Sequence, residues 1–321
     1  MCRTNVTWIL QPHGNSIEHM VRNIAQFLLL LATLIGSVPS IFGQQILLGV
    51  LEDNPGHYAG EANFRTVRVV FQKKGDDWQP FNSDCRDQAC LKAITSTYPS
   101  EVTWTVTFDG KNMGQVTSRT PADFAWYGSV GQQEITSKGP LPTVGVRSSE
   151  FGGFSDAAVY RPLVANSQPY FKDPERWKPT VISADLAPVL QRGFRKRFPK
   201  LCRLSGPDQS RLEPFRYRDA DVKVAKAYVS SSGWTVVRLH LQAVDCEDTE
   251  AGFEIDDPWF VVNTKQSATY LDSGMWLVDA GDYDNDGRSE LVFSINRYNR
   301  GGYEIYYDNF GKRAVFEFSY H

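Results

Sequence analysis

The chain has 321 residues, of which 41% are hydrophobic and 13% aromatic, so it can bury a substantial core in one domain or in two smaller ones. Its formal net charge is −3. A slightly acidic protein offers no general electrostatic attraction for nucleic acid, and we therefore expect no nucleic-acid partner.

The first predicted element is an export signal. Arg22 precedes an apolar run over residues 24–35, which is too short to span a membrane comfortably but has the length of a signal-peptide core. Small residues follow, ending at Gly43, and Met20 is a candidate for the true start because the residues before it are polar and without pattern. We predict a signal peptide over residues 1–43, with an uncleaved membrane anchor as the alternative.

Loss of the signal peptide would leave a mature chain of net charge −4 with four cysteines: Cys85, Cys90, Cys202 and Cys246. An even number in an exported chain predicts two disulfides. Three connectivities are possible, and the spacing favours Cys85–Cys90 as a local link and Cys202–Cys246 as a long one. A zinc site is disfavoured, because there is no CxxC pair and no partnering histidine cluster. We expect a secreted, periplasmic or otherwise extracellular protein with no membrane span after signal cleavage.

Strand-like segments recur along the chain. Residues 45–52 are apolar, residues 64–71 alternate, and residues 102–108 alternate cleanly before an Asp109-Gly110 turn. A second hairpin is predicted where residues 222–229 meet residues 234–244. These segments indicate an all-β protein.

Between the two hairpins, residues 120–179 are rich in glycine, proline and aromatic side chains. Long loops packed on a β core are the favoured interpretation, and a carbohydrate- or peptide-binding surface is the alternative. One helix is expected over residues 183–199, with Ser183 as N-cap and apolar residues at helical spacing. Five cations gather toward its end: Arg192, Arg195, Lys196, Arg197 and Lys200. A solvated face that suits the helix dipole is favoured, and a patch for anionic cell-surface polymers is the alternative.

The most specific pattern is a run of acidic residues near the carboxyl end. Asp282, Asp284, Asp286 and Glu290 fall within nine residues, and they would repel one another unless a cation neutralised them. These carboxylates and the Arg288 carbonyl provide about six oxygens for Ca²⁺. An acidic, solvated turn that binds nothing is the alternative.

The flanks of this run distinguish between kinds of calcium loop. An EF-hand beginning at Asp282 would need glutamate at its twelfth position, which is Phe293. Short apolar strands flank the run instead, over residues 275–278 and 291–295. At these residues the chain resembles the calcium loops of FG-GAP (VCBS-type) repeats, the units of integrin-α-like β-propellers. The resemblance covers about residues 275–321 and implies a four-strand blade with the metal loop between its first two strands.

We therefore predict an all-β fold, a degenerate β-propeller-like meander of hairpins with one helix, in a single β-rich domain over residues 44–321. A β-sandwich is the alternative, because no fixed repeat period of 40–60 residues is present.

The function favoured by these features is that of an exported, calcium-binding, non-catalytic binding or structural module, whose candidate partners are an extracellular protein or a glycan. The alternative is a secreted hydrolase directed at polysaccharide. No GxSxG or HExxH motif occurs, but paired loop carboxylates need no proximity in sequence. The candidate acids are Glu52, Asp53 and Glu61, or Asp245, Glu247 and Asp248.

Overall fold

The computed structural model describes residues 45–55, 63–85, 87–151, 157–205, 211–241, 243–246, 257–297 and 299–319. They belong to one compact unit that begins at Gln45. The predicted signal peptide lies outside the described residues. Among those described, no helix is both long enough and apolar enough to cross a membrane.

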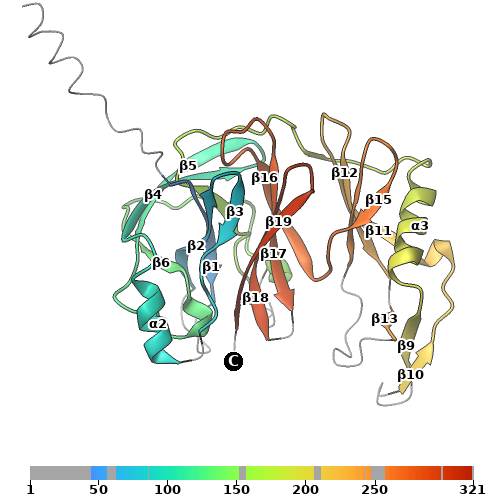
Figure 1. The fold of residues 1–321 in the computed structure, drawn as a ribbon, viewed down its shortest axis with the longest axis horizontal. Helices are drawn as coiled ribbons and strands as arrows, with labels where there is room; N and C mark the ends of the chain where they lie inside the picture. Colours follow the sequence, from blue (N-terminus) through green and yellow to red (C-terminus); the bar gives the residue numbers. More distant parts are fainter. Residues whose placement is uncertain are drawn as a thin grey trace, which may run out of the picture. The chain divides into compact units, whose positions relative to one another are not determined.

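The described chain is built from antiparallel strands in four sheets, which confirms the all-β class (Figure 1). The first sheet contains β1 (Leu47–Asn54), β2 (Phe64–Lys74), β3 (Asp77–Pro80), β4 (Glu101–Phe108), β5 (Lys111–Arg119), β6 (Gln132–Ile135) and β7 (Leu163–Asn166). Its order is β1-β7-β4-β5-β6-β2-β3, and β1 also pairs with β2. Six of these strands therefore close into a barrel-like ring.

Small and large residues combine to fill this ring. Trp104 of β4 is fully buried, and its Nε1 donates a hydrogen bond to Ser118 Oγ at 2.7 Å. A Cβ at Gly49 of β1 would lie 3.2 Å from the Trp104 ring and 3.0 Å from the Arg68 carbonyl oxygen. The absence of a side chain at Gly49 thus makes room for the indole.

The hairpin predicted at Asp109-Gly110 is confirmed, and both turn residues have positive φ (51° and 69°), as a tight two-residue hairpin requires. The closed ring itself differs from a simple meander of hairpins. Strand β7 lies between β1 and β4, and β6 lies between β5 and β2. Both come from residues 120–179, where the sequence pattern predicted only loops.

The remaining strands form three sheets. The order β15-β14-β12-β11-β8 joins β8 (Lys178–Pro179), β11 (Lys223–Val229), β12 (Thr235–His240), β14 (Trp259–Val262) and β15 (Ala268–Tyr270). A small sheet joins β9 (Leu201–Ser205), β10 (Arg211–Pro214) and β13 (Val244–Asp245) in the order β10-β9-β13. The last sheet is β16 (Met275–Gly281), β17 (Glu290–Arg297), β18 (Arg300–Tyr307) and β19 (Lys312–Ser319), paired in chain order. The predicted hairpin of β11 and β12 and the predicted four-strand C-terminal meander are both confirmed.

The C-terminal meander is apolar on both faces. Val292 and Phe316 pack into the same core as Trp104 of the closed sheet. Leu291 and Phe293, on the opposite face, pack into a second core with Trp259 of β14. Burial on both faces explains the continuous apolar runs of Met275–Val278 in β16 and Leu291–Phe293 in β17.

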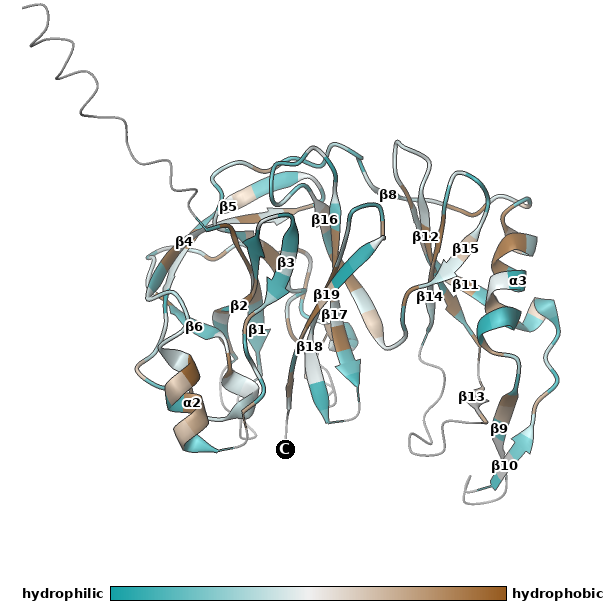
Figure 2. Ribbon diagram, viewed as in Figure 1, coloured by the Kyte–Doolittle hydropathy of each residue, from teal (hydrophilic) through white to brown (hydrophobic). Residues whose placement is uncertain are grey.

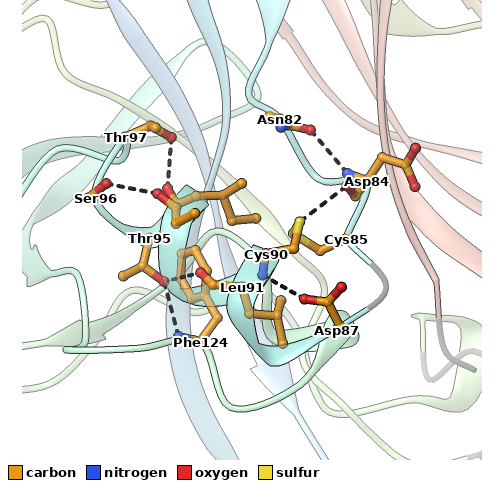
Figure 3. Close-up of a disulfide and its surroundings, with 12 residues drawn as sticks. Asn82, Asp84, Cys85, Asp87, Cys90, Leu91, Thr95, Ser96, Thr97 and Phe124 are labelled. Atoms are coloured by element: carbon orange, nitrogen blue, oxygen red, sulfur yellow. Dashed lines mark hydrogen bonds between the residues drawn. A yellow bond between two sulfur atoms is a disulfide. The ribbon is translucent and has the colours of Figure 1, made fainter.

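Two helices occur in the described residues, α2 (Gln88–Thr95) and α3 (Ala187–Arg197), where the sequence predicted one. The missed helix, α2, has eight residues, too few for a clear periodicity. Its N-cap is Asp87, which accepts a hydrogen bond from the Cys90 N–H at 2.8 Å (Figure 3). The predicted helix begins at Ala187, not at Ser183, and its Pro188 lies in the first turn, where proline is tolerated.

Both predicted disulfides are confirmed. Cys85–Cys90 joins the start of α2 to the segment before it (Figure 3), and Cys202–Cys246 joins β9 to the residue that follows β13. Three short 3₁₀ helices complete the described elements, at Tyr127–Ser129, Ser149–Phe151 and Asp219–Asp221.

Candidate metal centre

The acidic loop connects β16 to β17, and the strand pairing fixes its two ends. Gly281 pairs with Glu290, and Ala280 pairs with Leu291. A β-bulge lies between Leu277 and Asp279, and it leaves Val278 outside the pairing with β17. The residues on either side of the loop are therefore held next to each other before any ion is considered.

Contacts from the segment before α3 hold the first half of the loop. The Asp282 N–H donates to the Lys172 carbonyl at 2.8 Å, and the Phe171 ring stacks on the buried Tyr283 ring with centroids 5.7 Å apart. Asn166 of β7 donates to the Tyr283 carbonyl at 2.9 Å. A Cβ at Gly281 would collide with Phe171, so this close packing requires glycine there.

Three of the predicted ligands converge. One carboxylate oxygen each of Asp282, Asp284 and Glu290 lies within 4.8 Å of the others. Asp282 and Glu290 are only 5% and 2% exposed, and the Asp284 side chain is 3% exposed. The loop thus concentrates three largely buried carboxylates, which are the oxygen ligands that hard divalent cations prefer.

The other two predicted residues are not part of this triad. Asp286 uses its N–H to donate to Asp282 and to Asp284, both at 3.1 Å, and its carboxylate accepts from the Arg288 N–H at 2.8 Å. The Arg288 guanidinium pairs with Asp308 at 2.5 Å. No contact among the described residues places the Arg288 carbonyl at the triad.

The turn itself is built by backbone donors that face the first carboxylate. Gly287 adopts a φ of +87°, a region that side chains disfavour, and its N–H donates to Asp282 Oδ2 at 3.0 Å. These donors stabilise the negative charge of Asp282 but do not neutralise it.

Burial and mutual repulsion make the ionised triad unfavourable without a cation. Burial raises the pKa of Glu290 well above its ordinary value, and the nearby Asp284 charge adds to the rise. Burial also raises the pKa of Asp282, and the charges of Asp284 and Asp286 act in the same direction. A divalent cation bound to the triad would remove this penalty.

One cation of the chain already reaches the loop. The Lys73 ammonium, at the end of β2, pairs with Asp284 and lies 5.3 Å from the Trp78 ring centroid and 5.5 Å from that of Tyr307. Sequence reasoning missed Lys73, because 211 residues separate it from Asp284 and no local pattern marks it. Among the described residues, no lysine or arginine pairs with Asp282 or Glu290.

Two of the candidate hydrolase acids, Glu52 and Asp53, already have partners in the structure. Glu52 accepts hydrogen bonds from Arg68 and from the Tyr303 hydroxyl, both at 2.8 Å. Asp53 pairs with Arg147 at 3.0 Å and accepts the Tyr160 N–H at 2.9 Å.

The remaining candidate acids, Glu61, Glu247 and Asp248, lie outside the described residues. Asp245 is described only as part of strand β13. The structure therefore brings no pair of these acids together as free carboxylates within its described part.

Comparisons with protein-family models, with curated proteins and with solved structures find no match for this chain.

Proposed function

We propose that the protein is an exported β-rich module that serves in binding or scaffolding and not in catalysis. In this module Ca²⁺, bound by Asp282, Asp284 and Glu290, holds the β16–β17 hairpin. The observation that carries the proposal is the triad itself, three converging carboxylates of which two have no cationic side chain among the described residues as partner. Asp286 and the Arg288 carbonyl belong to the proposed ligand set if the turn tightens around the ion.

The surrounding architecture supports this proposal. A four-strand meander with an acidic loop between its first two strands is the arrangement that the resemblance to FG-GAP (VCBS-type) repeats implies, and both features are present in residues 275–319. A cation there would join β16 to β17 at the end where Gly281 pairs with Glu290. Because the meander packs into two cores, the ion would stabilise more than its own hairpin.

The cysteines support export. Four cysteines form two disulfides in the described structure, and disulfides persist mainly in oxidising compartments. Extracellular calcium is abundant enough to fill a site with a Kd of ~10⁻⁴–10⁻³ M. Such a weak site would therefore be loaded where the protein works.

The proposal is tested by thermal melting of the calcium-stripped chain with EDTA or with 2 mM CaCl₂. Ligand linkage predicts that calcium stabilises the chain by about 0.6–1.8 kcal/mol, which raises Tm by about 1–7 °C for a domain of this size. In parallel, polysaccharide panels are assayed for binding and for release of reducing ends. Equal melting with and without calcium would contradict the metal assignment, and turnover of a polysaccharide would contradict the non-catalytic role.

A further inference from the structure

A second feature of the molecule is its uneven charge. Residues 187–205 and 211–226, here called the basic segment, carry eleven lysines and arginines against three acids, while the whole chain has a net charge of −3. The basic segment therefore has a net charge of +8, and the rest of the chain −11. Its cations are Arg192, Arg195, Lys196, Arg197, Lys200, Arg203, Arg211, Arg216, Arg218, Lys223 and Lys226, and all are exposed except the half-buried Lys226.

The acids within the basic segment neutralise only part of this charge. Arg195 pairs with Asp219, Arg218 pairs with Asp221 at 3.0 Å, and Arg211 lies 3.6 Å from Glu213. Six further cations form no ion pair with a carboxylate among the described residues: Arg192, Lys196, Arg197, Arg203, Arg216 and Lys223. Hydrophilic residues of this segment colour the last turn of α3 and much of β10, whereas the first turns of α3 are hydrophobic (Figure 2).

Aromatic rings hold several of these arginines in place. The Arg203 guanidinium lies 4.0 Å from the Phe215 ring centroid, and that of Arg197 lies 4.7 Å from the Tyr270 centroid. Arg195 lies 5.7 Å from the Tyr217 centroid, which is itself 6.4 Å from the Phe215 centroid. A guanidinium over a ring keeps its in-plane N–H donors available, so Arg197 and Arg203 are oriented for an anion without being neutralised, whereas Arg195 already pairs with Asp219.

The helix dipole does not account for this arrangement. Cations in the last turn of a helix are favourable, and this explains Arg195, Lys196 and Arg197 of α3. The effect falls off within one turn. It cannot explain the cations of β9 and β10, or Arg216 and Arg218 beyond them.

We propose that the basic segment binds an extended anionic polysaccharide that carries sulfate or carboxylate groups. This partner class rests on the export part of the proposed function and needs no metal. Planar guanidinium donors suit sulfate and carboxylate oxygens, and several cations at different points suit a polymer with repeated charges.

The chemistry of the segment favours this partner over two others. Single-stranded nucleic acid is bound by exposed aromatic faces on which bases stack, but the rings of Phe215 and Tyr217 are at most half-exposed and lie against arginines. Insertion into a membrane surface needs a row of large apolar side chains. Within the described part of the basic segment, Val224 is the only exposed large apolar residue.

The test uses heparin as the probe, with biolayer interferometry at 0.1 M NaCl in EDTA. We compare the unmodified protein with Lys196→Gln/Arg197→Gln/Arg203→Gln and with a matched control, Lys111→Gln/Arg119→Gln/Lys138→Gln, which removes the same charge from exposed sites outside the segment. Circular dichroism and melting verify that each variant is folded.

The first triple variant is expected to weaken heparin binding at least tenfold, and the control less than threefold. Binding should fall steeply with added NaCl, and dextran sulfate, but not neutral dextran, should compete.

Several outcomes would overturn the inference: no heparin binding by the unmodified protein, equal loss in the two triple variants, or tighter binding to single-stranded DNA or to phosphatidylserine vesicles than to heparin. The EDTA condition separates this inference from the calcium assignment. Absence of heparin binding in a protein that still melts higher with calcium would refute only the basic segment. Binding of heparin by a protein that ignores calcium would refute only the metal site.

Discussion

Lys73 and Asp284, 211 residues apart in sequence, form an ion pair that joins the end of β2 to the acidic loop. The Lys73 side chain is 15% exposed and that of Asp284 3% exposed, so water screens the pair weakly. The ammonium neutralises the same carboxylate that the proposed calcium ion would bind. Lys73 therefore acts as an internal counter-ion when the metal is absent.

Replacement of Lys73 tests this relationship. Lys73→Met leaves the Asp284 carboxylate without its cation, which should cost about 1–3 kcal/mol in EDTA. Saturating calcium should recover most of the loss, because the ion supplies the missing charge. The measurement is urea unfolding in EDTA and in 2 mM CaCl₂, and Lys111→Met, at an exposed ion pair, is the control with a change below about 0.5 kcal/mol. An equal loss of stability with and without calcium would refute the idea that Lys73 and calcium neutralise the same Asp284 carboxylate.

Asp279 makes the stability depend on pH. It is buried between the closed sheet and the C-terminal meander, where its carboxylate accepts the Asp109 N–H at 3.0 Å and the Thr107 hydroxyl at 3.4 Å. Burial raises the pKa of Asp279 to about 7, above the 3.8 of an unperturbed aspartate. The folded state thus binds this proton more tightly than the unfolded state, and stability is lost as the pH rises from about 4 to about 7.

Asp279→Asn should remove that dependence. The amide oxygen can still accept the Asp109 N–H, and an amide does not ionise. Between pH 5 and pH 8, in saturating calcium, the free energy of unfolding of the unmodified protein should fall by about 3 kcal/mol relative to the variant. Urea unfolding at several pH values measures this difference. Parallel pH profiles for the two proteins would show that Asp279 is ionised throughout.

The two disulfides should differ in their contribution to stability. Cys202–Cys246 closes a loop with a sequence separation of 44, and Cys85–Cys90 one with a separation of 5. In the chain-entropy description, removal of the first should cost about 4 kcal/mol and removal of the second about 2 kcal/mol. Denaturant unfolding of Cys202→Ser/Cys246→Ser and of Cys85→Ser/Cys90→Ser measures both. A larger loss for the shorter loop would contradict this account.

The sequence predicted those parts of the fold that have a local cause. The Asp109-Gly110 hairpin follows from residues that tolerate positive φ, and the C-terminal meander follows from its apolar runs. The closed sheet was not predictable in the same way. Strand β7 (Leu163–Asn166) is buried at every position and so has no alternation, and it pairs with strands that lie far away in the chain.

In the candidate site, too, features with a local cause were predictable from the sequence, and features that depend on long-range packing were not. The spacing of Asp282, Asp284 and Glu290 indicated a common focus, and their carboxylates do lie together. Asp286 has the same spacing, but the structure uses its backbone and carboxylate to shape the turn. The Lys73 contact depends on how β2 packs beside the loop, and no local sequence pattern encodes such packing.

Binding of a divalent cation at the acidic triad is tested most directly by calorimetric titration of the calcium-stripped chain with CaCl₂. We predict a single calcium site with a Kd of ~10⁻⁴–10⁻³ M, lost in Glu290→Gln and retained in Glu134→Gln, which changes an exposed acid on β6. Absence of binding heat, or the same isotherm in Glu290→Gln as in the unmodified protein, would contradict the account.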